Sequence, residues 1–323
     1  MPSDVTNITQ IPHIHAAHAT NGQAGTGCTV ILCPQGAMGG VDVRGGAPAT
    51  RETDLLRPEE TVQELHAIVL AGGSAFGLAA SCGVAEELGR RGIGLDVGVG
   101  RVPIVSGACV FDLACGSATA WPTAAMGAAA TAAALDDTAP LASGNVGAGA
   151  GCTVGKLAGS LRAMKGGLGQ SVRQAGRLVC GAVSAVNACG SIRDPITGAP
   201  IAGMLDEEGA SVLAPMDALA TALDATPPLR TNTTISCVIT NARLTKAKAT
   251  KVAQISADAY AHTIYPTHTT NDGDAIFVMA TGEVEAGVDT IGILATQALE
   301  GAIADGVRSA RGAFGLKAAC DLP

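Results

Sequence analysis

An apolar strand followed by a glycine-rich turn and a helix is the pattern that most constrains the fold of this chain. The clearest unit has an apolar run at 67–71, then Gly72, Gly73 and Ser74, then a helix predicted over 75–88. The same periodicities predict other strands at 29–32, 101–112, 179–187, 233–240 and 275–279, and other helices at 124–135, 245–261 and 288–307. Strands that alternate with helices are typical of an α/β protein.

Glycine and proline mark the predicted breaks between these elements. We expect a turn at 34–40, a helix that begins near Pro58, a loop at 190–210 and a polar, proline-containing linker at 226–232. No sequence repeat of fixed period is found. We therefore treat 1–323 as one domain.

The composition supplies a large buried core and disfavours nucleic acid as a partner. Of the 323 residues, 47% are hydrophobic and only 15% are charged, so a disordered chain is not expected. The charged side chains should lie in solvent, among them Lys246, Lys248 and Lys251 of one predicted helix. A net charge of −8 disfavours phosphate-backbone binding, and seven aromatic residues are too few for a base-stacking platform.

Cysteine usage and the apolar runs indicate a cytoplasmic protein. None of the ten cysteines forms a C-x-x-C pair or a zinc-like Cys/His spacing, so we expect buried thiols in a reducing compartment. The first ten residues lack a secretion-signal pattern. The uncharged run 113–135 contains Pro122 and mostly small residues, which favours a buried helix over a membrane span.

Two glycine-rich stretches resemble catalytic motifs but miss a required residue. The P-loop-like stretch has Ala150 in place of its first glycine and Leu157 where Ser or Thr must hold Mg²⁺. Ser74 follows a strand as a nucleophile elbow would, but Phe76 replaces the required glycine. We therefore expect neither a nucleotide site nor a serine triad here.

Two other clusters have only weak metal-binding patterns, and we predict no metal or cofactor. His13, His15 and His18 are spaced as ligands could be, but no carboxylate or cysteine completes the set. Asp272 and Asp274 lie in a turn-forming segment that lacks the remaining ligands of a calcium loop. Two carboxylates this close can instead orient another group, and the pKa of one of them rises if they share a proton.

The sharpest feature is the junction at Asn232 and Thr233, where a linker ends directly in a strand that begins with two hydroxyl residues. Alternation puts Thr233 and Ile235 on one face and Thr234 on the other. If the chain is cut before Thr233, the new α-amino group, with an ordinary pKa of about 7.7–8.0, lies beside its own hydroxyl. It could then act as that hydroxyl's general base.

Six stretches in the same order resemble the L-aminopeptidase/D-esterase family of self-cleaving N-terminal-nucleophile hydrolases, which includes β-aminopeptidases. They lie at 41–48, 70–78, 144–149, 185–188, 232–235 and 268–274. Threonine at 233 and Lys156 are especially similar to the nylon-oligomer hydrolase branch. The resemblance implies a four-layer αββα sandwich related to the ornithine acetyltransferase fold. It also implies self-cleavage into an α chain, 1–232, and a β chain, 233–323, which stay together and form a homo-oligomer.

The resemblance also implies a role for each matching residue. Thr233 is the nucleophile, and the cleavage site is the bond between Asn232 and Thr233. Asn187 matches the oxyanion-site asparagine, and Lys156 matches a lysine of the threonine branch. The acidic pair, Asp272 and Asp274, orients the nucleophile. An amide and an ammonium are suitable donors to a developing oxyanion.

The chain departs from many relatives in ways that bear on substrate. Those relatives have a serine nucleophile and a different triplet in place of the acidic pair. Their β-amino-acid substrates are therefore not expected to be substrates of this chain. Some place a tyrosine hydroxyl near the oxyanion where this chain has Phe111. The expected activity is hydrolysis of amide bonds, and of ester bonds in some substrates, in small peptides or amino-acid amides. The alternatives are an acyltransferase of the ornithine acetyltransferase type, a nylon-oligomer-type ω-amide hydrolase, and a non-catalytic binding protein.

Overall fold

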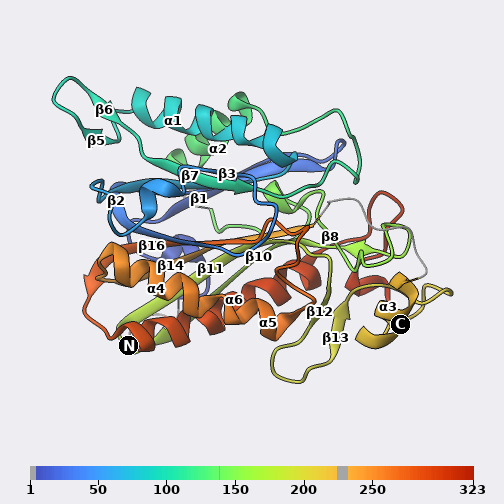
Figure 1. Cartoon of the computed structure of the whole chain (residues 1–323). Helices are drawn as coiled ribbons and strands as arrows, with labels where there is room; N and C mark the ends of the chain where they lie inside the picture. Colours follow the sequence, from blue (N-terminus) through green and yellow to red (C-terminus); the bar gives the residue numbers. More distant parts are fainter. Residues whose placement is uncertain (1–4, 138, 224–231) are drawn as a thin grey trace.

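Four layers make up the computed structural model, which describes residues 5–137, 139–223 and 232–323. Two β-sheets lie face to face, and each carries helices on its outer side (Figure 1). The αββα sandwich expected from the resemblance is confirmed.

A single long strand belongs to both sheets. The first part of β2 (Thr26–Val43) pairs with β1 and β4, and its last part pairs with β16. The strand order is β10-β11-β14-β16-β2-β4-β7-β3, with β1 on the other side of β2. The partner strands are β1 (His15–Asn21), β3 (Thr50–Arg51), β4 (Leu65–Ala71), β7 (Val105–Cys109), β10 (Gly167–Ala175), β11 (Leu178–Asn187), β14 (Thr233–Ala242) and β16 (Ala275–Val284).

Shorter strands and the helices complete the fold. The short strands are β5 (Leu95–Asp96), β6 (Arg101–Val102), β8 (Thr153–Val154), β9 (Met164–Lys165), β12 (Ser191–Arg193), β13 (Pro200–Ala202) and β15 (Ile264–Tyr265). The α-helices are α1 (Ala79–Arg90), α2 (Ala124–Asp136), α3 (Pro215–Leu223), α4 (Lys246–Ser256), α5 (Asp258–Thr263) and α6 (Val288–Ser309). The 3₁₀ turns are Ile8–Gln10, Asp54–Leu56, Ser74–Leu78, Gly147–Gly149 and Ala319–Asp321.

Strand β14 lies at the centre of this packing, and its predicted alternation is confirmed. Ile235 and Cys237 point between the two sheets, where Phe277 of β16 also packs. Val238 points the other way, toward the layer of α4, α5 and α6. All four side chains are fully buried, and each buried Ile, Val or Phe is worth about 1.5–3 kcal/mol. The strand that begins at Thr233 is therefore held on both faces.

The predicted turn at 34–40 is wrong, because β2 continues through it, with an irregular register between Leu32 and Ala37. Gly40 is needed for packing rather than for a turn: a Cβ added there would lie 2.5 Å from the backbone of Ala249 in α4. The predicted helix near Pro58 is also absent from the described chain, and the segment is held by Lys246, which is buried instead of solvated. The Lys246 ammonium donates hydrogen bonds to the carbonyls of Leu55 and Glu60 at 2.8 and 2.9 Å.

The other predicted elements differ in detail. The segment 190–210 holds the short strands β12 and β13, and the helix expected at 245–261 divides into α4 and α5. Most of the predicted linker 226–232 lies outside the described residues. All ten cysteines are free thiols, and eight of them are buried. In the described parts of the chain, no helix has the length and apolar character needed to cross a membrane.

Candidate active site

Thr233 is the first residue of β14, and strand pairing holds it from both sides. It lies opposite Asn187, the last residue of β11, and the preceding Asn232 forms a parallel bridge with Asp272. Asn232, Thr233 and Asp272 are all at least 96% buried. The junction between linker and strand is therefore an ordered part of the sheet.

The Thr233 hydroxyl donates a hydrogen bond to the carbonyl oxygen of Asn232. The backbone N–H of Gly273 donates to the same oxygen at 3.1 Å. A Cβ added at Gly273 would lie 2.9 Å from Thr233 Oγ1, so only glycine leaves room for the hydroxyl. The carbonyl of the 232–233 peptide bond is thus held by two donors, and one of them is the candidate nucleophile.

Asp274 holds the backbone beside the nucleophile rather than its hydroxyl. One carboxylate oxygen, Oδ1, accepts a hydrogen bond from the Thr234 N–H at 2.7 Å. The other, Oδ2, accepts from Thr267 Oγ1, from the His268 N–H and from His268 Nδ1, at 3.1, 3.0 and 2.9 Å. These contacts fix the carboxylate in one orientation.

Asp272 is the less satisfied member of the acidic pair. Its Oδ2 accepts from the Thr269 N–H at 2.6 Å, whereas its buried Oδ1 has no hydrogen-bond partner among the described residues. Burial, and then the charge of Asp274, raise the pKa of Asp272 to about 6. A carboxyl with this pKa can change protonation near neutral pH.

Asn187 and Lys156 lie on the β11 side of the junction. Asn187 Oδ1 accepts hydrogen bonds from the Thr153 N–H at 2.9 Å and from Lys156 Nζ at 3.0 Å. Asn187 Nδ2 donates to the carbonyl of Phe111 at 2.9 Å. These partners orient the amide with its nitrogen away from Lys156. Burial lowers the pKa of Lys156 to about 8, and attraction to Asp272 is among the opposing effects.

The loop at 44–47 supports the acidic loop through its backbone. The N–H groups of Arg44 and Gly45 donate to the carbonyl of Asp274, and the Ala47 N–H donates to that of Asp272, at 2.8–3.2 Å. A Cβ added at Gly45 would overlap the Asp272 carbonyl oxygen and the Asp274 nitrogen. The loop at 44–47 thus fixes the backbone position of the loop that carries Asp272 and Asp274.

A second glycine motif supports Phe111. The Gly73 N–H donates to Asp112 Oδ1 at 2.6 Å, and Thr26 Oγ1 donates to its Oδ2 at 2.7 Å. A Cβ added at Gly72 would overlap the Asp112 carboxylate. Burial raises the pKa of Asp112 to about 6. This carboxyl anchors the residue next to Phe111, whose carbonyl accepts from Asn187.

The structure brings all the predicted site residues together: Thr233, Asn187, Lys156, Asp272 and Asp274, with Asn232 at the junction. Thr153, Gly273 and His268 were not singled out from the sequence, although His268 begins the motif at 268–274. Tyr260, which lies behind the site, carries no local signal because it is one aromatic residue in a helix.

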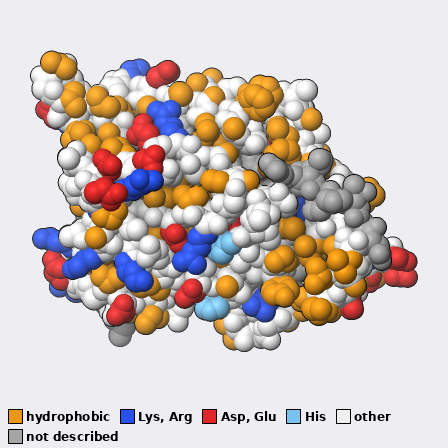
Figure 2. All heavy atoms as spheres, viewed as in Figure 1, with side chains coloured by type: hydrophobic (Ala, Val, Ile, Leu, Met, Phe, Trp, Pro, Cys, Tyr) orange, Lys and Arg blue, Asp and Glu red, His pale blue; other side chains and the backbone are white. Residues whose placement is uncertain are grey.

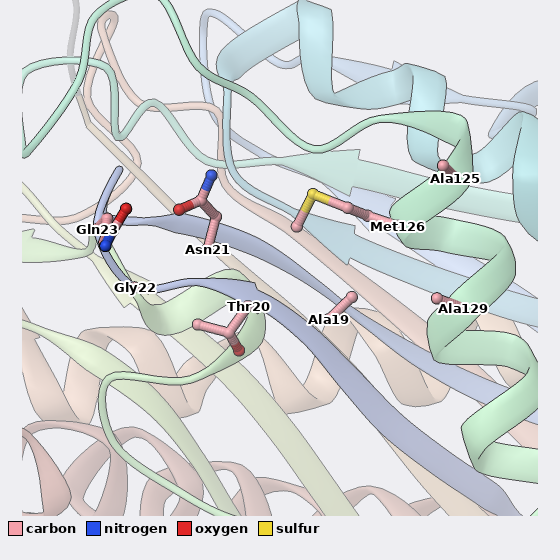
Figure 3. Close-up of a pocket in the computed structure, with 8 residues that line it drawn as sticks. All are labelled: Ala19, Thr20, Asn21, Gly22, Gln23, Ala125, Met126 and Ala129. Atoms are coloured by element: carbon pink, nitrogen blue, oxygen red, sulfur yellow. The ribbon is translucent and has the colours of Figure 1, made fainter.

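Two of the histidines considered as metal ligands have partners within the protein. His18 bonds to Thr29 Oγ1 and to the Ala142 carbonyl, and His13 pairs with Glu283 at 3.5 Å. Across residues 5–137, 139–223 and 232–323, no three His, Cys, Asp or Glu side chains come together as a metal site. An open cleft of about 490 Å³ lies between β1 and α2 (Figure 3). Its lining contains no ionisable side chain and consists of residues 19–23 with Ala125, Met126 and Ala129.

The chain is similar to known proteins over most of its length. The model of peptidase family S58 matches residues 6–319. An uncharacterised aminopeptidase of Mycobacterium tuberculosis is 41% identical over 92% of this chain and 89% of its own length. A 6-aminohexanoate-oligomer endohydrolase of Agromyces sp. is 32% identical over 84% of this chain and 73% of its own length.

Solved structures show the same fold at low sequence identity. A β-aminopeptidase of Burkholderia sp. superposes with a TM-score of 0.67 at 19% identity, covering 98% of this chain and 92% of its own. An L-aminopeptidase D-Ala-esterase/amidase of Ochrobactrum anthropi, a variant of the N-terminal-nucleophile hydrolase fold, superposes with a TM-score of 0.68 at 16% identity, covering 96% and 88%. Both likenesses extend over almost the whole chain.

Proposed function

Because this chain belongs to peptidase family S58 and is a hydrolase of amide bonds, we propose that it cleaves itself before Thr233 and then uses Thr233 as an N-terminal nucleophile. The observation that carries the proposal is the contact between the Thr233 hydroxyl and the Asn232 carbonyl. A hydroxyl beside the carbonyl of its own peptide bond is suited to attack that bond.

Self-cleavage proceeds by an acyl shift. Thr233 Oγ1 forms a bond to the carbonyl carbon of Asn232, the bond from that carbon to the Thr233 nitrogen breaks, and the nitrogen takes up the hydroxyl proton. Water then hydrolyses the ester. The products are a carboxylate on Asn232 and a free α-amine on Thr233. The chains of 232 and 91 residues are those that the family resemblance implies.

Hydrolysis of a substrate reuses the same groups. The α-amine of Thr233 takes the proton from Oγ1, which attacks the substrate carbonyl and forms an acyl-enzyme. The proton passes to the leaving amine, and water releases the acid. Asn187 Nδ2 donates to the Phe111 carbonyl in the intact chain, and we assign this amide to the oxyanion once the chain is cut. Lys156, bonded to Asn187 Oδ1, adds positive charge beside it.

The substrate is a small peptide or amino-acid amide that fits where Asn232 lies in the intact chain. Asn232 and the side chains around it are buried, so substrate reaches Thr233 only after cleavage lets the new carboxylate move aside. One relative is an oligomer endohydrolase and another an aminopeptidase, which supports an ω-amide or an α-amino amide as substrate. Transfer of the acyl group to an amine is the competing outcome.

The two chains stay associated, and we propose that the cleaved pairs form a homo-oligomer. Hydrophobic side chains gather on the face around α3 (Figure 2). Met216, Leu219 and Leu223 of α3 are 67, 45 and 80% exposed. An exposed apolar patch of this kind supports an interface between subunits.

Intact-mass analysis and Edman sequencing test the proposal. Wild-type protein should give two chains, the smaller one beginning Thr-Thr-Ile. Thr233→Ala should remain one uncut chain without amidase activity, and Thr233→Ser should still be cut because it keeps the hydroxyl. A panel of amides with and without an added amine acceptor separates hydrolysis from acyl transfer. An uncut Thr233→Ala protein that hydrolyses amides would overturn the proposal.

A further inference from the structure

Side chains hold both backbone polar groups of Thr234, the residue after the candidate nucleophile. Its N–H donates to Asp274 Oδ1 at 2.7 Å, and its carbonyl accepts from the Tyr260 hydroxyl at 3.0 Å. Pairing between β14 and β16 begins one residue later, at Ile235 and Ala275. The start of β14 is therefore positioned by side chains rather than by β16 alone.

Tyr260 reaches this point from α5 and is fully buried. Its hydroxyl also lies 2.8 Å from Ser236 Oγ and 3.5 Å from the Ala275 carbonyl. Burial raises the pKa of the phenol well above its ordinary value, so it stays a neutral donor. One hydroxyl thus connects the strand of the nucleophile with the strand that follows the acidic pair.

His268 connects Tyr260 with Asp274. Its ring stacks on the Tyr260 ring with centroids 5.4 Å apart and an interplanar angle of 21°. Its Nδ1 lies 2.9 Å from Asp274 Oδ2, and its backbone N–H donates to the same oxygen at 3.0 Å. The residue has a φ of +56°, a conformation that is unfavourable for most residues other than glycine and asparagine.

We propose that Tyr260 and His268 are positioning residues that set the geometry of Asp274 and Thr234, and through the backbone that of the Thr233 hydroxyl. The inference rests on the proposed role of Thr233. The hydrogen bonds of these side chains near the site go to Thr234 and Asp274 rather than to Thr233, so both act on turnover through other residues. A misplacement of about 1 Å at a reacting group can cost about 100-fold in rate.

Paired variants isolate each contact. Tyr260→Phe keeps the stacked ring and removes only the hydroxyl. His268→Asn and His268→Gly both tolerate the positive φ, but only asparagine keeps a donor near the position of Nδ1. His13 supplies the matched control, because it also has a positive φ, +67°, and faces a carboxylate, Glu283, at 3.5 Å.

The measurements are the self-cleavage rate by mass spectrometry, kcat and KM on an amide substrate, and thermal unfolding. We expect Tyr260→Phe and His268→Gly to lower the cleavage rate and kcat about 10- to 100-fold with KM changed less than about threefold. His268→Asn should recover most of the loss, and His13→Gly and His13→Asn should match wild type.

Several outcomes would overturn the inference. They are wild-type kcat in both Tyr260→Phe and His268→Gly, equal loss in His268→Asn and His268→Gly, and a loss confined to KM. If Tyr260→Phe or His268→Gly is unfolded at the assay temperature, the folded His268→Asn protein is the test. A kcat for it no higher than the residual activity of the unfolded variants also overturns a positioning role. Activity in Thr233→Ala would instead remove the proposed function on which the inference rests.

Discussion

At the scale of single residues, Asn187 is oriented by its partners before any substrate arrives. Its Oδ1 is occupied by Thr153 and Lys156, and its Nδ2 points toward the Phe111 carbonyl. An amide held in this way does not have to reorganise when negative charge develops on a nearby oxygen, which is the condition for effective oxyanion stabilisation.

We therefore expect Asn187→Ala to lower kcat about 10²- to 10³-fold, the cost of losing one oxyanion donor, with little change in KM. Steady-state kinetics on one amide substrate measures both quantities. The protein must first be shown to be cut, because the same donor would assist self-cleavage. A large rise in KM with unchanged kcat would contradict the assignment.

The lowered pKa of Lys156 predicts how turnover depends on pH. In the proposed mechanism the Thr233 amine must be neutral to act as a base, so we expect activity to rise with pH through its ordinary pKa of about 7.7–8.0. The Lys156 ammonium, with a pKa lowered to about 8, is lost as pH rises further, so activity falls again. We expect a narrow bell in kcat between pH 6 and 10. A wild-type kcat that stays level up to pH 10 would show that the ammonium is not required.

The raised pKa of the Asp272 carboxyl predicts that the free energy of unfolding depends on pH. Its folded pKa, about 6, is above the unfolded value, so its contribution is present in full below about pH 3.8 and is lost as pH rises through 6. Denaturant unfolding of Thr233→Ala, with and without Asp272→Asn, measures it at pH 4 and pH 7. The asparagine substitution should be relatively more favourable at pH 7, and an equal effect at both values contradicts the prediction.

At the scale of elements, the loop at 44–47 functions by backbone approach alone. Its N–H groups hold the carbonyls of Asp272 and Asp274, and glycine at 45 permits that distance. Neither loop is a regular element. The relative position of the two acidic residues therefore depends on a segment more than 200 residues earlier in the sequence.

Gly45→Ala should displace the acidic loop, because the new Cβ overlaps backbone atoms that cannot rotate away. We expect self-cleavage and kcat to fall about 100-fold or more, consistent with misplacement of about 1 Å. Gly100→Ala is the matched control, since a Cβ there meets nothing within 4 Å. Equal self-cleavage rates and equal kcat in the two variants would show that the loop at 44–47 does not position the acidic loop.

At the scale of the whole molecule, the proposed cut divides the central sheet without dividing the core. The 233–323 chain supplies β14 and β16, and β14 lies between β11 and β16. Two hydrophobic clusters combine residues from both chains: Val183 packs with Ile235 and Phe277 between the sheets, and Met164 belongs to the cluster beneath α6. Separation of the chains would expose both clusters to water.

We therefore expect the cleaved protein to stay one particle in native buffer and to separate into two chains only in denaturant. Native and denaturing mass spectrometry of the same sample check this, with Thr233→Ala as the uncut reference. Release of the 233–323 chain in native buffer would contradict the packing argument.

Local patterns in the sequence determined a large part of this picture. The alternation at Thr233, Ile235 and Cys237 predicted which residues share a face of β14, because side chains in a strand alternate with a period of two. The six spaced motifs predicted the family and the residues that converge, and four of them contain glycines, which are required where backbones approach closely.

Contacts between distant segments were decided only by the tertiary structure. The turn predicted at 34–40 is wrong because α4 packs on Gly40, and Lys246 is not in solvent because its ammonium donates to two carbonyls from another segment. The same reason applies to Tyr260 and His268, whose stacking and hydrogen bonds depend on how α5 packs behind β14. Such partners carry no signal in their own neighbourhood, because burial and hydrogen bonding are properties of the packed chain rather than of a local stretch of sequence.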